Sequence, residues 1–177
     1  MYRDKSLLPK EGIRLAALGL LASEGPMAYA ALAQAVRQFT NTFWGPTLDV
    51  MSSSIELLRF EGLIEVGPED RREVSITDAG RAHVTELLDS AVRSPSTDFN
   101  KLVVALKLRY LHLLPEAERD DQLGALAEAR QGERARLVDL RAREGNGSAT
   151  FLAWLDHEIA RIDADLALYA ELRARVG

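Results

Sequence analysis

Apolar residues in the first part of the chain recur at the spacing of short α-helices. Residues 12–23 contain almost no polar position, which predicts a first helix that is buried on several sides. A Gly-Pro pair ends this pattern, and a second helix is predicted over about 28–39. A third helix begins at about Thr47, a suitable N-cap, and ends near Gly62. The predicted inward positions of the third helix are Leu48, Met51, Ile55 and Leu58.

Two β-rich runs follow the third helix and predict a hairpin. The runs 63–66 and 71–76 flank a cluster of turn residues at 67–70. Thr77 then caps a fourth helix that extends to about Val92. Three helices, a hairpin and a further helix follow the order of a winged helix-turn-helix fold.

A polar, proline-containing segment at 93–98 separates this region from a purely helical one. We place a domain boundary here, which gives one domain at 1–93 and a second at 94–177. The second domain should contain a helix that Pro115 ends, a long helix over 116–144, a Gly-rich turn and a last helix.

The last helix carries an apolar stripe whose members are spaced by three and four residues in turn, as in a coiled coil. Two antiparallel helices joined by a Gly-rich turn cannot bury both of their apolar stripes alone, so a symmetric dimer is predicted. The fold class is therefore mostly α with a small β-hairpin wing, a winged helix-turn-helix followed by antiparallel C-terminal helices that form a dimer. The predicted interface residues are Leu152, Leu155, Ile159, Ile162, Leu166 and Tyr169.

Composition and charge narrow the classes of function. The chain of 177 residues has no cysteine, which excludes disulfides, thiolate metal sites and thiol nucleophiles. Residues 1–90 hold nine basic and thirteen acidic side chains, and the rest hold thirteen and fourteen, so neither half is a basic domain. The N-terminus has no apolar signal region and no apolar run is long enough to cross a membrane, so we expect a cytoplasmic protein without membrane contact.

Four short motifs lie at fixed places in this framework. They are LGLL at 18–21, FWGP at 43–46, LRFEGLI at 58–64 and SITDAGR at 75–81. In this order they resemble the PadR family of bacterial transcriptional regulators, and the resemblance extends over nearly the whole chain. The C-terminal helices are similar to the dimerisation region of the family branch that includes virulence regulators. The resemblance implies a repressor, not an enzyme, that binds an inverted-repeat operator in double-stranded DNA as a homodimer.

A winged-helix protein of this kind would contact DNA through its third helix, its wing and its first helix. Hydroxyl groups on the third helix would approach bases and phosphates, and cations on the other elements would neutralise phosphates. Ser52 replaces the tyrosine that is usual in the family, and Glu56 would repel phosphate, so the operator and the contacts should differ from those of the family. The predicted DNA-binding residues are Lys10, Arg14, Thr47, Ser52, Ser53, Ser54, Arg59, Arg71 and Arg72.

The acidic first domain leaves a second function open, a dimeric winged-helix module that has lost DNA binding and recognises a protein. We expect no cofactor for either function. We also expect no metal site, because the three histidines lie on separate predicted helices without metal-ligand spacing. A small aromatic effector would fit a pocket between the domains. The aromatic residues predicted to line that pocket are Phe43, Trp44, Phe99, Tyr110 and Trp154.

Overall fold

The computed structural model describes residues 6–44, 55–67, 73–92, 97–145 and 148–176. The chain divides into two compact units, Met1–Leu114 and Pro115–Gly177. Each unit has its own packing and is described by itself.

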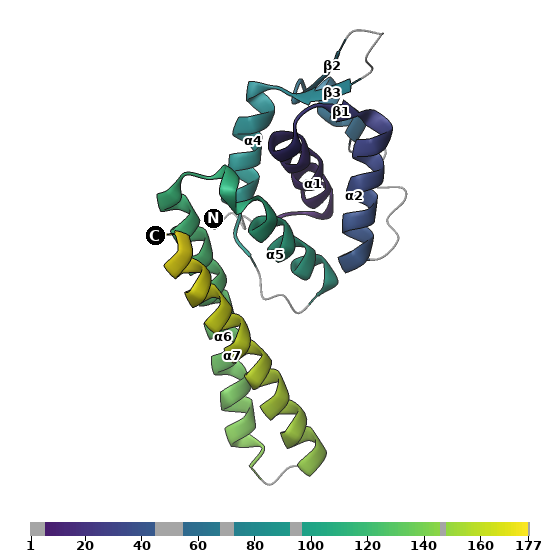
Figure 1. Cartoon of the computed structure of the whole chain (residues 1–177). Helices are drawn as coiled ribbons and strands as arrows, with labels where there is room; N and C mark the ends of the chain where they lie inside the picture. Colours follow the sequence, from purple (N-terminus) through teal and green to yellow (C-terminus); the bar gives the residue numbers. More distant parts are fainter. Residues whose placement is uncertain (1–5, 45–54, 68–72, 93–96, 146–147, 177) are drawn as a thin grey trace, which may run out of the picture. The chain divides into compact units, whose positions relative to one another are not determined.

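In the first unit, helix α1 lies at the centre and other helices pack around it (Figure 1). Its residues 12, 13 and 15–21 are all buried, which confirms the prediction of a helix buried on several sides. α1 contacts α2, α4 and α5, so its apolar surface is covered from several directions. The bounds of the helices are α1 Pro9–Glu24, α2 Tyr29–Trp44, α4 Asp78–Leu88, α5 Asp98–Tyr110 and a 3₁₀ turn at Leu111–Leu113.

The sheet of the first unit is small and antiparallel. Its order is β1-β3-β2, with β1 at Met27–Ala28, β2 at Ile64–Val66 and β3 at Glu73–Ile76. Ile64 pairs with Ile76 across β2 and β3, and both side chains are buried. The predicted wing hairpin and the predicted winged-helix order are therefore confirmed.

α4 begins as the sequence predicts, because the Thr77 hydroxyl accepts a hydrogen bond from the backbone N–H of Gly80 at 3.0 Å. Gly80 also allows α4 to lie close to the strand region, since a Cβ there would stand 2.1 Å from the carbonyl oxygen of Leu63. The helix ends at Leu88, before the predicted end at about Val92.

α5 belongs to the first unit, so the division after Leu114 does not coincide with the boundary expected at residues 93 and 94. α5 packs on α1 and α2. The ring of Tyr110 lies against Gly19, and its hydroxyl donates to the carbonyl oxygen of Ala16 at 3.1 Å. A polar segment marks a change in the chain, but the buried face of the helix that follows decides which core that helix joins.

In the second unit, α6 (Glu116–Arg143) and α7 (Ala149–Val176) form an antiparallel hairpin (Figure 1). Leu155, Ile162 and Tyr169 of α7 are buried, and so are Leu123 and Leu126 of α6. The two long helices predicted from the sequence are confirmed.

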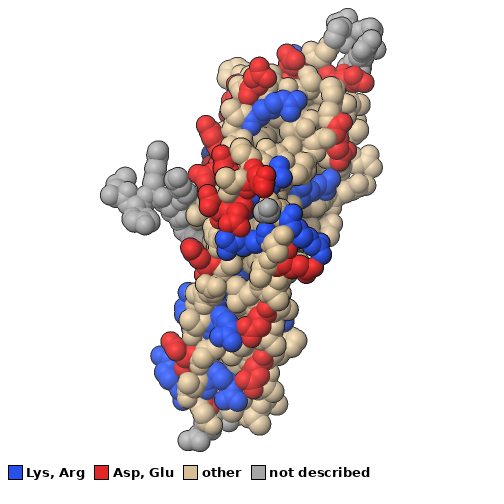
Figure 2. Space-filling model, turned by 60° about the vertical axis from the view of Figure 1, so that its left-hand side comes forward, with Lys and Arg blue, Asp and Glu red and all other residues tan. Residues whose placement is uncertain are grey.

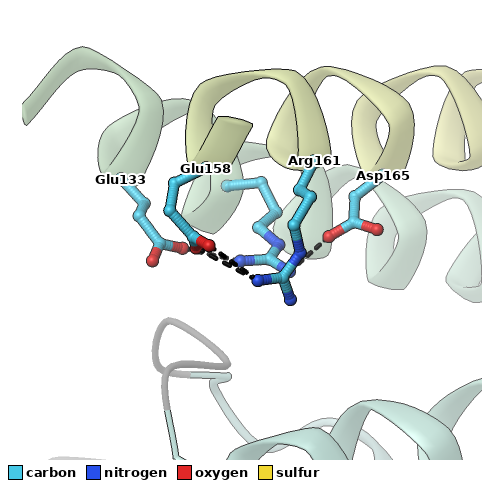
Figure 3. Close-up of polar contacts among 5 residues, drawn as sticks. Glu133, Glu158, Arg161 and Asp165 are labelled. Atoms are coloured by element: carbon cyan, nitrogen blue, oxygen red, sulfur yellow. Dashed lines mark hydrogen bonds and ion pairs between the residues drawn. The ribbon is translucent and has the colours of Figure 1, made fainter. Parts of the chain in front are cut away.

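Arginine–aspartate pairs fix the register of the hairpin. The residue number on α6 rises as the number on α7 falls, as an antiparallel pair requires. In the middle of this array, Glu133 and Asp165 both bind the guanidinium of Arg130. Figure 3 shows this region, where Arg161 pairs with Glu158 on its own helix. The pairs between the helices are Asp120–Arg173, Arg130–Asp165, Arg134–Asp163 and Arg141–Asp156.

Candidate nucleic-acid interface

The predicted DNA-binding residues fall partly inside and partly outside the described residues. The second half of the third helix is described, and residues 55–60 are helical as predicted. Lys10, Arg14 and Arg59 can be placed. The others, Thr47, Ser52, Ser53, Ser54, Arg71 and Arg72, lie outside the described residues.

The third helix presents the expected faces over the part that is described. Ile55 and Leu58 are almost fully buried, which confirms them as inward positions. Glu56 and Arg59 are exposed on the other side of the same helical turns. This arrangement leaves an outer helix face available to a large partner such as a DNA groove.

Arg14 and Lys10 lie on α1 but differ in their surroundings. The Arg14 guanidinium forms an ion pair with Glu61 at 2.6 Å, and its side chain is only 15% exposed. Arg14 therefore ties α1 to the end of the third helix, whereas Lys10 is exposed at the first turn of α1.

The described part of the wing is acidic. Glu65 on β2 and Glu73 on β3 are exposed, and Glu65 accepts a hydrogen bond from the Ser75 hydroxyl at 3.3 Å. The basic residues of the predicted wing, Arg71 and Arg72, lie outside the described residues.

The α6–α7 hairpin has no surface of a single charge on the face that Figure 2 shows. Acidic and basic side chains are intermixed over it.

A groove of about 610 Å³ lies beside the third helix, and we call it the wing groove. It runs between that helix, the start of α2 and the wing strands. Burial, and then the negative charge of Glu56, raise the pKa of Tyr29. The sequence pattern does not indicate this groove, because its lining residues come from the start of α2, the third helix and the wing strands, which lie apart along the chain. The residues that line the wing groove are Tyr29, Glu56, Arg59, Phe60, Ile64, Val66 and Val74.

The aromatic residues predicted to line an effector pocket serve different packing roles. Phe43 packs against Phe39, with ring centroids 5.3 Å apart. Tyr110 is buried, and burial raises its pKa to about 12. The cavity beside Tyr110 measures about 10 Å³, which is the scale of a single water molecule and not of an aromatic ligand.

The remaining aromatic residues of that prediction are Phe99, Trp44 and Trp154. Phe99 lies against Gly12 of α1. Trp44 is the last residue of α2. Trp154 belongs to the second unit, where it is 51% exposed and stacks on Phe151. The effector pocket stays a prediction.

The residues of the predicted dimer stripe on α7 differ in how far the α6–α7 hairpin buries them. Leu155, Ile162 and Tyr169 are buried within the second unit, whereas Leu152, Ile159 and Leu166 are half-buried. Other large apolar side chains of the hairpin are exposed, and they are Phe151, Trp154 and Leu168 of α7 and Val138 of α6.

Other kinds of site are not found in the described part of the chain. No group of histidine and carboxylate side chains there is arranged to hold a metal ion. None of the helices in the same ranges is long and apolar enough to cross a membrane. His83 instead contacts Glu86 on its own helix at 3.0 Å, and His112 contacts Ser23 of α1 at 3.2 Å.

Comparisons with known proteins give a matching family model and matching solved structures. Residues 2–173 match a family model described as "Putative AphA-like transcriptional regulator". The crystal structure of Bacillus subtilis PadR is 17% identical, with a TM-score of 0.42 and coverage of 97% of this chain and 98% of that one. The structure of the same protein in complex with p-coumaric acid is 16% identical, with the same coverage and a TM-score of 0.39. No curated protein matches the sequence.

Proposed function

The chain belongs to the AphA-like family of transcriptional regulators, and from this premise we propose that it represses transcription by binding an operator in double-stranded DNA. The family membership agrees with the resemblance to PadR-type regulators seen in the sequence motifs. This family is one of transcriptional regulators, which is not an enzyme class.

The exposed face of the third helix is the structural observation that supports this proposal. The third helix of the winged-helix unit buries Ile55 and Leu58 and leaves the face with Glu56 and Arg59 exposed. A helix held in this way can enter a major groove without losing its own core contacts. Lys10, Arg59, Arg71 and Arg72 would supply the phosphate contacts, which dominate affinity for DNA.

Fluorescence anisotropy with DNA from upstream of the chain's own gene tests this function, with a scrambled duplex as competitor. We expect sequence-selective binding that weakens between two salt concentrations, because phosphate contacts release counterions. The double variant Arg71→Ala/Arg72→Ala should bind weakly and show a shallower salt dependence. Arg136→Ala/Arg143→Ala removes the same charge from exposed positions on α6 and should bind as the unchanged protein does.

A negative result on this DNA leads to selection from random duplexes, since an operator can lie elsewhere. A protein that selects no sequence would contradict the proposal. The acidic side chains Glu56, Glu65 and Glu73 would then favour the alternative function, a winged-helix module that binds a protein.

We further propose that the operator is an inverted repeat that a homodimer binds, with half-sites about 10 base pairs apart or a multiple of that. The exposed apolar residues of α7 support self-association through the hairpin.

A further inference from the structure

We propose that the wing groove binds a small organic ammonium ion with an apolar body, and that this ligand competes with DNA. The first part concerns the groove alone. The second part rests on the proposed function, because it requires that the third helix contacts DNA.

The wing groove is lined by large apolar side chains that are exposed to water. The Phe60 side chain is 90% exposed, and Val66 and Tyr29 are 44% and 39% exposed. Exposed apolar residues that cluster around a concavity mark a binding site more often than scattered ones do. The volume of about 610 Å³ lies within the range of small-molecule sites, and its lining of mostly apolar residues with a few charged ones is also typical.

The charge of the ligand follows from Glu56 and the two aromatic rings. Within the described residues, no ion pair engages Glu56, and its charge acts on Tyr29. An ammonium group between Glu56 and the rings of Tyr29 and Phe60 would gain both Coulomb attraction and cation–π contacts. Ile64, Val66 and Val74 would then cover the apolar body of the ligand.

Arg59 is the opposing charge in the wing groove. It lies three residues after Glu56 on the same helix, so a carboxylate ligand bound to Arg59 would also face Glu56. The net charge of −5 on the chain further favours a cation over an anion. Arg59 should therefore weaken cation binding while it supports DNA binding, which gives one residue opposite effects on the two ligands.

The ammonium ligand and DNA should compete because they would use the same residues of the third helix. Glu56, Arg59 and Phe60 line the wing groove and belong to the helix that the proposed function places on DNA. A ligand seated there adds positive charge at the interface but fills the space that a phosphate strand near Arg59 would occupy. Binding of either partner should lower the apparent affinity for the other by the same factor.

Isothermal titration calorimetry of the full chain tests the site with three matched probes: 4-phenylbutyltrimethylammonium, 4-phenylbutanol and 4-phenylbutyrate. We expect the ammonium probe to bind one site per chain and to bind more tightly than the other two. Glu56→Gln should weaken it about tenfold, which corresponds to about 1.4 kcal/mol. Phe60→Ala should weaken it severalfold, and Arg59→Gln should strengthen it.

Leu57→Ala is the matched control, because Leu57 is an exposed apolar residue of the same helix that does not line the wing groove. It should leave ammonium binding unchanged. Phe60 is so exposed that its truncation should not alter folding, which circular dichroism would verify. Preferred binding of phenylbutyrate, an unchanged affinity in Glu56→Gln, or no binding at millimolar concentrations would overturn the proposal.

A second measurement separates the site from the competition. The ammonium probe should displace operator DNA in the anisotropy assay, and it should do so less well with Glu56→Gln. Calorimetric binding without displacement would refute the competition and leave the site intact. If the protein binds no DNA at all, the proposed function fails, and calorimetry still decides whether the wing groove holds the cation.

Discussion

Lys107 of α5 is only 1% exposed, and its ammonium donates a hydrogen bond to the carbonyl oxygen of Leu88 at the end of α4. The carbonyl end of a helix carries partial negative charge, which favours a cation there. Burial outweighs this attraction and lowers the pKa of Lys107 to about 8, while the nearby charge of Asp89 acts in the opposite direction. The first unit therefore carries a buried charge between two of its helices.

The stability of the first unit should depend on the protonation of Lys107. A lysine in the unfolded chain has a pKa of about 10.4, so between pH 8 and 10 the unfolded state binds more protons than the folded state. The free energy of unfolding should therefore rise with pH in this range, and the cost of the buried charge should be fully present below pH 8. From pH 7 to pH 9.5 this contribution amounts to about 2 kcal/mol.

Urea unfolding of the unchanged protein and of Lys107→Met at pH 7 and pH 9.5 measures this effect. The variant should lack the gain, since methionine keeps the volume and has no proton to lose. All other titrating groups are common to both proteins, so their contributions cancel in the comparison. Equal pH dependence in the two proteins would refute the assignment to Lys107.

Substitutions of Arg14 and Lys10 should have different effects, one on stability and the other on DNA binding. The ion pair of Arg14 with Glu61 is partly screened from water, so Arg14→Gln should lower the free energy of unfolding by about 1 kcal/mol. Lys10→Gln should leave stability unchanged and weaken DNA binding, because Lys10 is exposed at the start of α1. Denaturant midpoints and anisotropy on the same samples measure both effects. A stable Arg14→Gln variant with lost DNA binding would reverse these roles.

At the scale of elements, hydrophobic periodicity predicted α1, the wing strands and the long C-terminal helices. It succeeded because each of these elements carries its own pattern, and α4 was predicted in addition from its cap at Thr77. It could not predict β1 at Met27–Ala28, since two residues are too few for an alternation to show. It also could not assign α5 to the first unit, because an apolar stripe does not specify which surface will cover it.

Two glycines in helices should respond in opposite directions to alanine. A Cβ at Gly80 of α4 would stand 2.1 Å from the carbonyl oxygen of Leu63 and 2.7 Å from Cγ1 of Ile76, so Gly80→Ala must displace the helix from the strands. We expect a loss of about 2 kcal/mol or more. At Gly132 of α6 the nearest atom is 3.8 Å away, so Gly132→Ala should add about 0.5–1 kcal/mol through helix propensity.

Denaturant unfolding of both variants, followed by circular dichroism, provides the measurement. Gly132→Ala serves as the control for Gly80→Ala, because both changes add one methyl group inside a helix. If Gly80→Ala were neutral, α4 would not pack on the strand region as closely as the structure indicates.

At the scale of the whole molecule, the sequence predicted that the apolar stripe of α7 forms the dimer interface, but part of this stripe is buried within the α6–α7 hairpin. Leu155, Ile162 and Tyr169 are buried within the hairpin itself. The sequence could not reveal this division, because an intramolecular and an intermolecular seam have the same spacing. Beside the buried seam, Trp154 and Leu168 remain exposed, and small exposed alanines recur every seven residues at 153, 160 and 167.

The exposed residues of α7 therefore give a better test of the proposed dimer than the buried ones. Ile162→Glu would place a charge inside the hairpin and unfold it, so a loss of dimer in that variant would be uninformative. Trp154→Glu/Leu168→Glu changes only exposed side chains and should yield a folded monomer in sedimentation equilibrium. Ala135→Glu, at an exposed position on α6, is the control and should stay dimeric.

Cross-linking can locate the dimer contact directly, because the chain contains no cysteine. Ala160→Cys should form a disulfide-linked dimer under mild oxidation if the α7 surfaces of two copies meet near this position, and Ala135→Cys should not. A protein that stays dimeric with Trp154→Glu/Leu168→Glu and does not cross-link through Ala160→Cys would associate through another surface. If the variant is monomeric, its affinity for an inverted repeat should fall towards that for a single half-site, since the two DNA-binding units would no longer be joined.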